Sequence, residues 1–134
     1  MTLRSILVLH NEPVLPKDHP DAESEHSVVE VAAEMSKILG EAGYQVRQLG
    51  LGPEPTVLWN ELKEHKPDVI FNLYEGNADN TQTESIVAGL LEWSKIPYTG
   101  SPFTALTLAR AKHTTKYLLT WARLPTADFL VVNA

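Results

Sequence analysis

The fold is decided by a short stretch near the start of the chain, Ser5-Ile6-Leu7-Val8-Leu9. It is a continuous apolar run bounded by polar residues, which is typical of a strand buried on both faces of a parallel sheet. A second run of the same kind follows later, Asp68-Val69-Ile70-Phe71-Asn72-Leu73. Between and after these runs, apolar residues recur at steps of three and four, as in amphipathic helices. Strands and helices therefore alternate, and we expect an open, mainly parallel, Rossmann-like α/β sheet with helices on both faces.

The boundaries of the expected elements follow from turn and cap residues. Strands are predicted over residues 5–9, 44–49, 68–73, 97–99 and 129–132, and helices over residues 56–66, 83–93 and 102–122. Another helix is predicted from a cap at Ser24 or Ser27 to residue 42, with Gly43 as its left-handed exit. Ser101 is expected to cap the last helix, with Pro102 at its first position.

Composition excludes several classes of protein. The chain has 134 residues, enough for one domain, and its 21% charged and 43% hydrophobic residues are ordinary for a globular protein. No apolar run approaches the roughly 20 residues that cross a bilayer, and Met1 leads into the first strand without a signal-peptide pattern. We therefore expect a cytoplasmic protein without membrane contact. The absence of cysteine excludes a disulfide framework and a zinc–thiolate site, and the net charge of −6 argues against a nucleic-acid surface.

The candidate site lies in the loops after the first and third predicted strands, because open α/β sheets bind ligands at the carboxyl ends of their strands. Both loops are rich in polar residues: the first contains His10, Asn11, Glu12, Asp18, His19, Asp21, Glu23, Glu25 and His26, and the other contains Tyr74, Glu75, Gly76, Asn77, Asp79 and Asn80. No glycine-rich dinucleotide turn, Walker loop or Gly-x-Ser-x-Gly elbow is present. The histidine spacing matches no compact metal motif, so no metal site is predicted.

Two sets of residues on the predicted helices have both a structural and a functional interpretation. Trp59, Trp93 and Trp121 fall at positions compatible with core packing, and we interpret them as structural rather than as stacking platforms. Lys112 and Lys116 lie four apart and hence on one helix face, where they are either solvated or approach a phosphate.

Residues 68–76, the helix over residues 84–92 and the segment Ile96-Pro97-Tyr98-Thr99-Gly100-Ser101-Pro102 occur in a fixed order and spacing. This pattern is similar to the N-terminal domain of ATP-grasp ligases related to D-alanine:D-alanine ligase. Residues 108–116 and 124–132 resemble the junction where those enzymes pass into their nucleotide-binding domain. The resemblance implies a pre-ATP-grasp domain over residues 1–102, followed over residues 103–134 by a junction helix and the first strand of an otherwise absent ATP-grasp domain.

The resemblance also implies an activity and site residues. It implies the N-terminal, substrate-side portion of an ATP-dependent carboxylate–amine ligase that acts through an acyl phosphate, with ATP and Mg²⁺ as cofactors of the intact enzyme. Residues 23–27 resemble the acidic-Ser segment whose glutamate holds the ammonium of the first amino acid. Glu25 is the best positional match, and Glu23 is a close rival. Tyr74 and Glu75 follow the third strand on the substrate side, and Lys112 matches a lysine in a region that approaches the ATP phosphates.

The departures from the family pattern concern the substrate. Tyr74-Glu75-Gly76 stands where D-alanine ligases carry His-Gly, and residues 79–83 replace an acidic Glu-Asp-Gly run. We therefore expect a related ligase with another amino-acid or peptide substrate. Because no segment offers the acidic cluster that holds catalytic Mg²⁺, the 134-residue chain alone is expected to be inactive and to bind neither cofactor tightly.

A second hypothesis comes from a different functional class. The chain could be a stand-alone, non-catalytic Rossmann-like module that binds a small anion or a partner protein. A reading frame that continues past Ala134 would favour the ligase. In either case the predicted strand over residues 129–132 lacks a partner, and we expect it to pair in a homodimer or to be poorly ordered.

Overall fold

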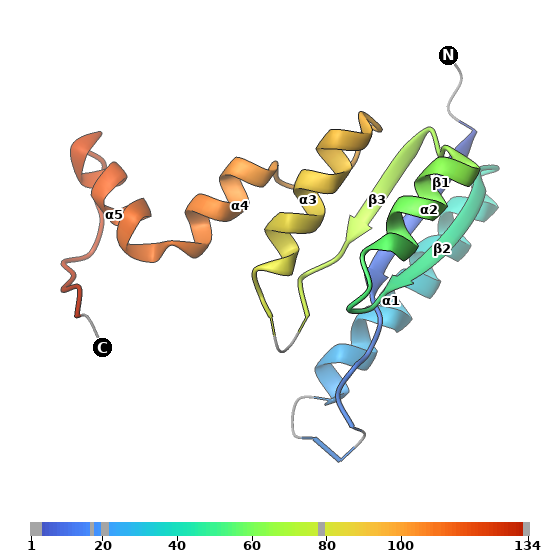
Figure 1. The fold of residues 1–134 in the computed structure, drawn as a ribbon, viewed down its shortest axis with the longest axis horizontal. Coiled ribbons are helices and arrows are strands. Elements are labelled where there is room, and N and C mark those ends of the chain that lie inside the picture. Colours follow the sequence, from blue (N-terminus) through green and yellow to red (C-terminus); the bar gives the residue numbers. More distant parts are fainter. Residues whose placement is uncertain (1–3, 17, 20–21, 78–79, 133–134) are drawn as a thin grey trace.

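A computed structural model of the chain describes residues 4–16, 18–19, 22–77 and 80–132, without the side chains of Ser24 and Glu25. Three parallel strands, β1 (Ser5–Asn11), β2 (Gln45–Leu51) and β3 (Val69–Leu73), form a sheet of order β2-β1-β3. The helices are α1 (Ala22–Glu41), α2 (Thr56–His65), α3 (Thr83–Ser94), α4 (Phe103–Arg110) and α5 (Lys112–Trp121) (Figure 1). The open, parallel α/β fold predicted from the apolar runs is confirmed.

The central strand is β1, which pairs with β2 on one side and with β3 on the other. Its residue Leu9 lies opposite Leu49 in β2 and Asn72 in β3. The strand continues two residues beyond the predicted end at Leu9, since His10 and Asn11 keep pairing with β2. Both of these polar residues are buried, so the strand end belongs to the interior rather than to the loop.

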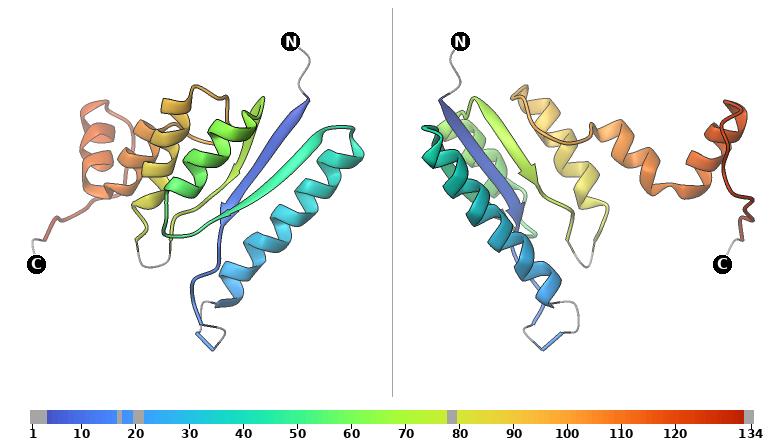
Figure 2. Two further views of the ribbon diagram at one scale, coloured as in Figure 1. Left: turned by 45° about the vertical axis from the view of Figure 1, so that its right-hand side comes forward. Right: turned by 180° about the vertical axis from the view of Figure 1, so that it is seen from behind.

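Helices cover both faces of the sheet, as predicted (Figure 2). On one face α1 packs on Ile6 and Val8 of β1, with Ala32 at the contact. The other face carries Leu7 and Leu9, which form the larger core cluster with apolar residues of α2 and α3. Successive side chains of a strand point to opposite faces, so an apolar run such as that of β1 supplies both cores. Each fully buried leucine contributes about 1.5–3 kcal/mol to this packing.

The exposed edge of β3 is covered by the short segment 97–99, where a strand was predicted. Ile70 and Tyr98 form a single parallel bridge, and the Thr99 N–H donates to the Ile70 carbonyl at 3.0 Å. The Thr99 hydroxyl oxygen also accepts the Asn72 N–H at 3.0 Å. This segment therefore satisfies edge groups of β3, which leaves less of the strand free to pair with another chain.

Glu92 of α3 joins the body of the domain to α4. One of its carboxylate oxygens accepts the Tyr98 hydroxyl at 3.1 Å and the Phe103 N–H, the first amide of α4, at 2.8 Å. Burial and the hydrogen bond to Glu92 raise the pKa of the Tyr98 hydroxyl above its ordinary value. This carboxylate thus caps α4 from a neighbouring helix, since no side chain at the α4 N-cap does so.

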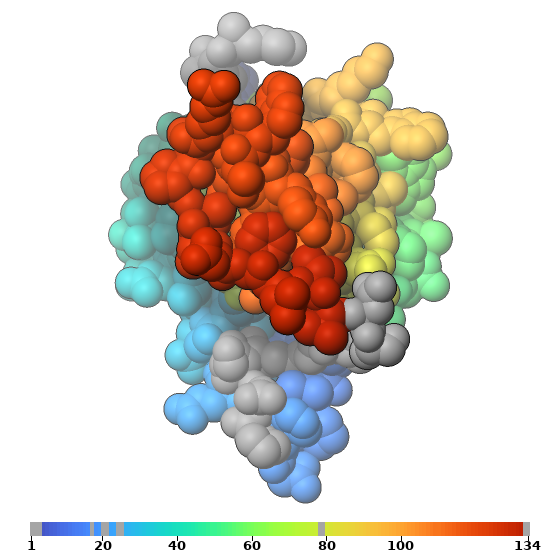
Figure 3. All heavy atoms as spheres, turned by 90° about the vertical axis from the view of Figure 1, so that its left-hand side faces the viewer, coloured from blue at the N-terminus to red at the C-terminus, as the bar shows by residue number. Residues whose placement is uncertain are grey.

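The C-terminal arm, defined here as residues 103–132, projects away from the sheet on the side of α3 (Figure 1). In the described part of the chain α4 and α5 bury no residue, although both carry apolar side chains. Figure 3 shows the end of the arm, with α5 and the residues after it, at the front of the molecule. The arm is attached mainly through α4, which packs against α3.

The single helix predicted over residues 102–122 is wrong, because the chain breaks at Ala111 into α4 and α5. Ala111 has φ −81° and ψ 71°, outside the helical region. The Leu108 carbonyl accepts the hydroxyl of Thr115 there, which replaces part of the backbone bonding that a continuous helix would provide. The expected cap is also displaced, since Pro102 rather than Ser101 occupies the N-cap and no side-chain hydrogen bond forms there.

Two other boundaries differ from prediction. The first helix begins at Ala22, which is buried, rather than after a cap at Ser24 or Ser27. The strand predicted over residues 129–132 does not form, and residues 125–132 have no regular structure. A strand is stable only when a neighbour accepts and donates its backbone hydrogen bonds, and in the described part of the chain this segment has none. The left-handed exit at Gly43 is confirmed, with φ 94°.

The structural interpretation of two tryptophans is also wrong. Trp93 is 77% exposed and Trp121 is 84% exposed, whereas Trp59 is half-buried. The helical periodicity identified an apolar face on each helix, but for α5 no described element packs on that face.

Candidate functional site

The carboxyl ends of β1 and β3 are joined by the side chain of Asn11. Its Oδ1 accepts the Glu75 N–H at 2.8 Å, and its Nδ2 donates to the Gly76 carbonyl. Asn11 is the last residue of β1 and is only 8% exposed. The end of β1 and the loop after β3, which the sequence placed at one edge of the sheet, therefore meet there through a buried carboxamide.

The loop after β3 is held by a chain of side-chain hydrogen bonds. The Tyr74 hydroxyl donates to Asn77 Oδ1 at 3.0 Å, and the Asn77 N–H donates to Thr83 Oγ1 at 2.8 Å. That threonine hydroxyl in turn donates to the Asn80 carbonyl at 2.6 Å. The loop has no regular structure, yet its described backbone groups are tied both to its own side chains and to the start of α3. These bonds tie the described parts of the loop to the start of α3.

His10 lies at the same end of β1 but on the sheet face covered by α1. Its Nδ1 is 2.7 Å from the carbonyl of Asn11, and its Nε2 is 3.0 Å from the Gln48 side-chain nitrogen. A carbonyl can only accept, so Nδ1 carries the hydrogen and Nε2 accepts from the amide. Both ring nitrogens are thus used within the protein. In the described residues no group of three or more His, Asp or Glu side chains is placed to hold a metal ion.

The structure places the predicted substrate-side residues in different surroundings. Glu75 is exposed, and within the described residues its carboxylate makes no hydrogen bond. Tyr74 is 4% exposed and packs in the core, so its contribution to this edge is the support of the loop. Glu23 is exposed in the first turn of α1, which starts beyond the carboxyl end of β1 (Figures 1 and 2). Glu25 belongs to the same turn, but its side chain lies outside the described residues.

Lys112 is not brought to this edge. It is the exposed first residue of α5, on the C-terminal arm. Lys116, one turn later, donates to the Ala127 carbonyl at 2.8 Å and to Thr126 Oγ1 at 3.2 Å, and lies 5.3 Å from the centre of the Phe129 ring. The two lysines therefore differ: Lys116 ties the end of the chain to α5, and Lys112 is left for solvent or a ligand.

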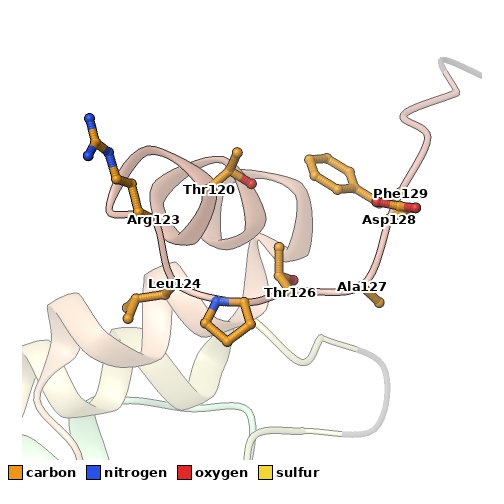
Figure 4. Close-up of a pocket in the computed structure, with 8 residues that line it drawn as sticks. Thr120, Arg123, Leu124, Thr126, Ala127, Asp128 and Phe129 are labelled. Carbon is orange, nitrogen blue, oxygen red and sulfur yellow. The ribbon is translucent and has the colours of Figure 1, made fainter.

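Two hollows lie along the arm rather than at the strand ends. One, of about 740 Å³, separates the end of α5 from residues 124–129 (Figure 4). The Phe129 ring turns toward α5 there, while Arg123 points away. The other, of about 500 Å³, lies between α3 and α4 beside the pair formed by Arg110 and Glu84, whose charged atoms are 3.2 Å apart. The first hollow is bounded on one side by residues 124–129, which belong to no helix or strand, so we do not regard it as a formed site.

Comparison with known proteins identifies the relatives of this fold. The chain is 37% identical over 112 residues, 84% of its length, to D-alanine–D-alanine ligase of Ruegeria sp. (strain TM1040). It is 36% identical over 111 residues, 82% of its length, to the enzyme of that name from Gluconobacter oxydans (strain 621H). The chain is related to the D-alanine–D-alanine ligases. The resemblance to the N-terminal region of an ATP-grasp ligase is confirmed by these matches. No family model matches the chain.

The relationship covers only part of the ligases. The matches span 34% and 36% of the lengths of these two relatives, so the chain spans about a third of a D-alanine–D-alanine ligase. A ligase from Ruegeria pomeroyi gives the same picture, with 37% identity over 81% of the chain and 33% of the relative. None of the helices in the described part of the chain is both long and apolar enough to span a membrane.

Sequence reasoning found the edge of the sheet but not its internal bonding. Asn11 and Asn77 were recognised as polar loop residues, whereas their partners are 64 and 6 residues away along the chain. Thr83 was missed, although a threonine at the start of a helix is a common signal for a side-chain cap. Asn72 was read as part of an apolar strand, and its side chain accepts the Tyr74 N–H at 3.2 Å.

Proposed function

We propose that this chain is the substrate-side portion of an ATP-dependent carboxylate–amine ligase related to the D-alanine–D-alanine ligases. The proposal depends on the sequence relationship to these ligases, which covers 84% of the chain. Because open α/β sheets bind ligands at the carboxyl ends of their strands, we place the substrate at the ends of β1 and β3, which we call the substrate edge. At this edge Glu75 presents a free carboxylate on a backbone that is fixed by Asn11. The proposed ligand is an amino acid or peptide whose ammonium group binds there.

The acidic side chains suit an ammonium group. Glu75 and Glu23 are both exposed at the carboxyl edge, and Glu25 lies in the same helical turn as Glu23. A carboxylate that accepts N–H groups from an ammonium forms a charge-assisted hydrogen bond, which is stronger than a neutral one. The proposed role of these residues is to bind and orient the first substrate. Glu75 replaces the histidine of the D-alanine ligase pattern, so we propose a substrate other than D-alanine.

The cofactors of the proposed reaction are not held by the described residues. When bound to the intact enzyme, ATP with Mg²⁺ would activate the substrate carboxylate as an acyl phosphate, which the amine of the second substrate then attacks. No described group of His, Asp and Glu fits the metal, so we derive no step through it. Lys112 is the proposed phosphate contact, since it is exposed at the start of α5. ATP-dependent chemistry accords with the cytoplasmic location expected from the sequence.

The C-terminal arm has a separate place in the proposal. We propose that residues 103–134 form the junction with an ATP-grasp domain, and that this domain supplies the metal ligands and the main nucleotide contacts. The exposed apolar side chains of the arm, such as Leu118, Trp121 and Leu130, support this assignment because a packed partner would bury them. Without that domain, the 134-residue chain is expected to show no ATP hydrolysis or ligation above background.

Binding of an ammonium-bearing probe tests the site directly. We expect D-alaninamide, used here for the ammonium group that any amino-acid or peptide substrate shares, to shift the backbone NMR signals of Glu75 and Gly76 in the 134-residue chain. N-acetyl-D-alaninamide, which lacks the ammonium, should leave them unchanged. Glu75→Gln should weaken binding about tenfold or more, the cost of one charge-assisted hydrogen bond. Glu64→Gln is the matched control, because Glu64 is an exposed carboxylate near the end of α2.

The same binding experiment also tells which acidic residue contacts the ammonium group. A loss of affinity in Glu25→Gln but not in Glu23→Gln would assign the ammonium contact to the positional match of the family segment. Equal binding of the two probes, or shifts confined to the C-terminal arm, would contradict the proposed substrate edge.

A further inference from the structure

Asn11 stands out among the buried polar residues of the described chain because both ends of its carboxamide bond to the backbone of a distant loop. The acceptor Oδ1 takes the Glu75 N–H, and the donor Nδ2 gives to the Gly76 carbonyl, 64 and 65 residues later in the sequence. Its position at the end of the central strand is itself fixed by pairing with β2 and by the hydrogen bond that its carbonyl accepts from His10 Nδ1. The loop is therefore held by the most constrained strand of the sheet.

The rest of the loop bonding does not reach Glu75. Tyr74 and Asn77 are tied to each other and to Thr83, on either side of the residue that carries the free carboxylate. Within the described residues, the hydrogen bonds to the backbone of Glu75 and Gly76 from outside the loop come from Asn11 alone. Gly76 adopts φ 96°, a conformation that glycine reaches without steric cost, so the backbone alone does not hold the loop in this position. The carboxamide is thus the contact that decides where Glu75 lies.

We propose that Asn11 is a positioning residue that sets the location of the Glu75 carboxylate and so determines the affinity of this edge for ammonium-bearing substrates. This inference rests on the proposed function, from which it takes the role of Glu75, and it adds a residue that touches no substrate. It also explains the residue type. A carboxamide offers one donor and one acceptor on the same planar group, whereas ionised aspartate only accepts and leucine does neither.

Amide hydrogen exchange measures the positioning itself, independently of any ligand. In Asn11→Leu we expect the Glu75 amide to exchange about tenfold faster, because its buried acceptor is lost. Asn11→Asp provides a conservative variant with a distinctive signature. Its ionised carboxylate still accepts the Glu75 N–H, but it cannot donate to the Gly76 carbonyl and repels it. Protonation restores the donor, so the protection factor of the Glu75 amide, corrected for the intrinsic pH dependence of exchange, should rise as the pH is lowered. The titratable residues next to this position are His10 and Glu12 along the chain and Glu75 through its backbone N–H.

The matched control is Ser36→Ala, which removes one hydroxyl from the opposite face of the sheet. Ser36 donates to the Ala32 carbonyl at 2.7 Å and to Gln48 Oε1 at 3.3 Å, and within the described residues it makes no hydrogen bond to the loop after β3. The variants are compared at equal stability, set by urea, so that global loosening is separated from loss of positioning. D-alaninamide is the binding probe for each variant, with N-acetyl-D-alaninamide as its uncharged counterpart.

The results separate the inference from the function on which it rests. Faster exchange at Glu75 with at least fivefold weaker binding of D-alaninamide in Asn11→Leu, and neither effect in Ser36→Ala, would support the inference. Unchanged exchange or unchanged binding in Asn11→Leu would overturn it while leaving the proposed function intact, provided that Glu75→Gln still loses affinity. If Glu75→Gln binds as well as the natural chain, the substrate edge is wrong and the inference falls with it, whatever the exchange rates show.

Discussion

Replacement of Gly76 by alanine should unfold the loop after β3 and lower the stability of the whole domain. Gly76 has φ 96°, and a Cβ atom at this position would lie 3.2 Å from the Thr81 carbonyl oxygen and 3.3 Å from the Glu84 nitrogen. Both neighbours are backbone atoms, which cannot move aside as the end of a flexible side chain can. The substitution therefore combines an unfavourable backbone conformation with a steric conflict.

The two costs can be estimated separately. An L-residue at positive φ costs about 1–2 kcal/mol relative to glycine. Overpacking against atoms that must shift by a few tenths of an ångström typically costs about 1–3 kcal/mol more. The free energy of unfolding should thus fall by roughly 2–5 kcal/mol in Gly76→Ala, a large fraction of the roughly 5–15 kcal/mol of an ordinary domain.

Substitutions at two other glycines separate the cost of the backbone conformation from the cost of the steric conflict. Gly43 has nearly the same conformation, φ 94°, but a Cβ atom there would meet nothing within 4 Å. Gly43→Ala should therefore lose only the conformational term of about 1–2 kcal/mol. Gly40 lies in α1 with open space around it, so Gly40→Ala should stabilise the domain by about 0.5–1 kcal/mol.

Urea unfolding followed by far-UV circular dichroism gives the free energies of unfolding of the three variants and of the natural chain on one scale. The expected order of stability is Gly40→Ala, the natural chain, Gly43→Ala and Gly76→Ala. If Gly76→Ala and Gly43→Ala lose the same stability, the contacts with Thr81 and Glu84 carry no cost and the loop is softer than its hydrogen bonds indicate. A Gly76→Ala variant as stable as the natural chain would refute the reasoning altogether.

Three further predictions concern other parts of the molecule. The Asp68 carboxylate accepts hydrogen bonds from the Arg4 and Ser5 backbone amides and from the Ser5 hydroxyl, which lower its pKa below the ordinary 3.8. Because the folded pKa is lower than the unfolded one, this stabilisation is complete above about pH 4 and is lost as the pH falls through the folded value. Urea midpoints measured against pH should fall less steeply in acid for Asp68→Asn than for the natural chain. Glu92→Ala should lower the free energy of unfolding by about 1 kcal/mol, whereas Glu92→Gln, which keeps an acceptor for the Phe103 N–H, should lose less; equal losses would contradict the bridging role. Light scattering should find a dimer for the intact chain and a monomer for a chain ending at Thr126, because the exposed apolar residues that follow are removed; a monomeric intact chain would count against the predicted homodimer.

The sheet could be predicted from sequence because its signal is local. The runs over residues 6–9 in β1 and 69–71 in β3 are continuously apolar, and such runs, alternating with helical segments, fit a doubly covered parallel sheet. The end of β1 was placed too early because His10 and Asn11 are polar. Their burial depends on partners in β2 and in the loop after β3, which lie some 40 and 65 residues away and carry no local signal.

The C-terminal arm was predicted less well for the opposite reason. Alanine is the best helix former, so nothing in the sequence around Ala111 indicates a break, and the break appears only with its hydrogen-bonding context. The exposure of Trp121 could not be read from periodicity, which identifies an apolar face but not the presence of a partner for it.

The location of the candidate site could be predicted from the sequence, but the hydrogen bonds within it could not. The position of Glu75 follows from the topological rule for strand ends, whereas the choice of Asn11 as its anchor depends on side-chain geometry. Glu23 and Glu25 remain alternatives, as they were from the sequence, and Lys112 stays a prediction that depends on a bound nucleotide.

The central position of β1 in the sheet has a consequence for the synthesis of the protein on the ribosome. This strand is made first, yet its two neighbours come later, and β3 ends only at Leu73. At a synthesis rate of about 5–20 residues per second, the roughly 60 residues between Asn11 and Leu73 take about 3–12 s to appear. During that interval the most deeply buried of the described strands has one side or both without a partner. A chaperone that binds short extended apolar segments would find its target here, and arrested nascent chains ending before β3 should retain it while longer ones release it.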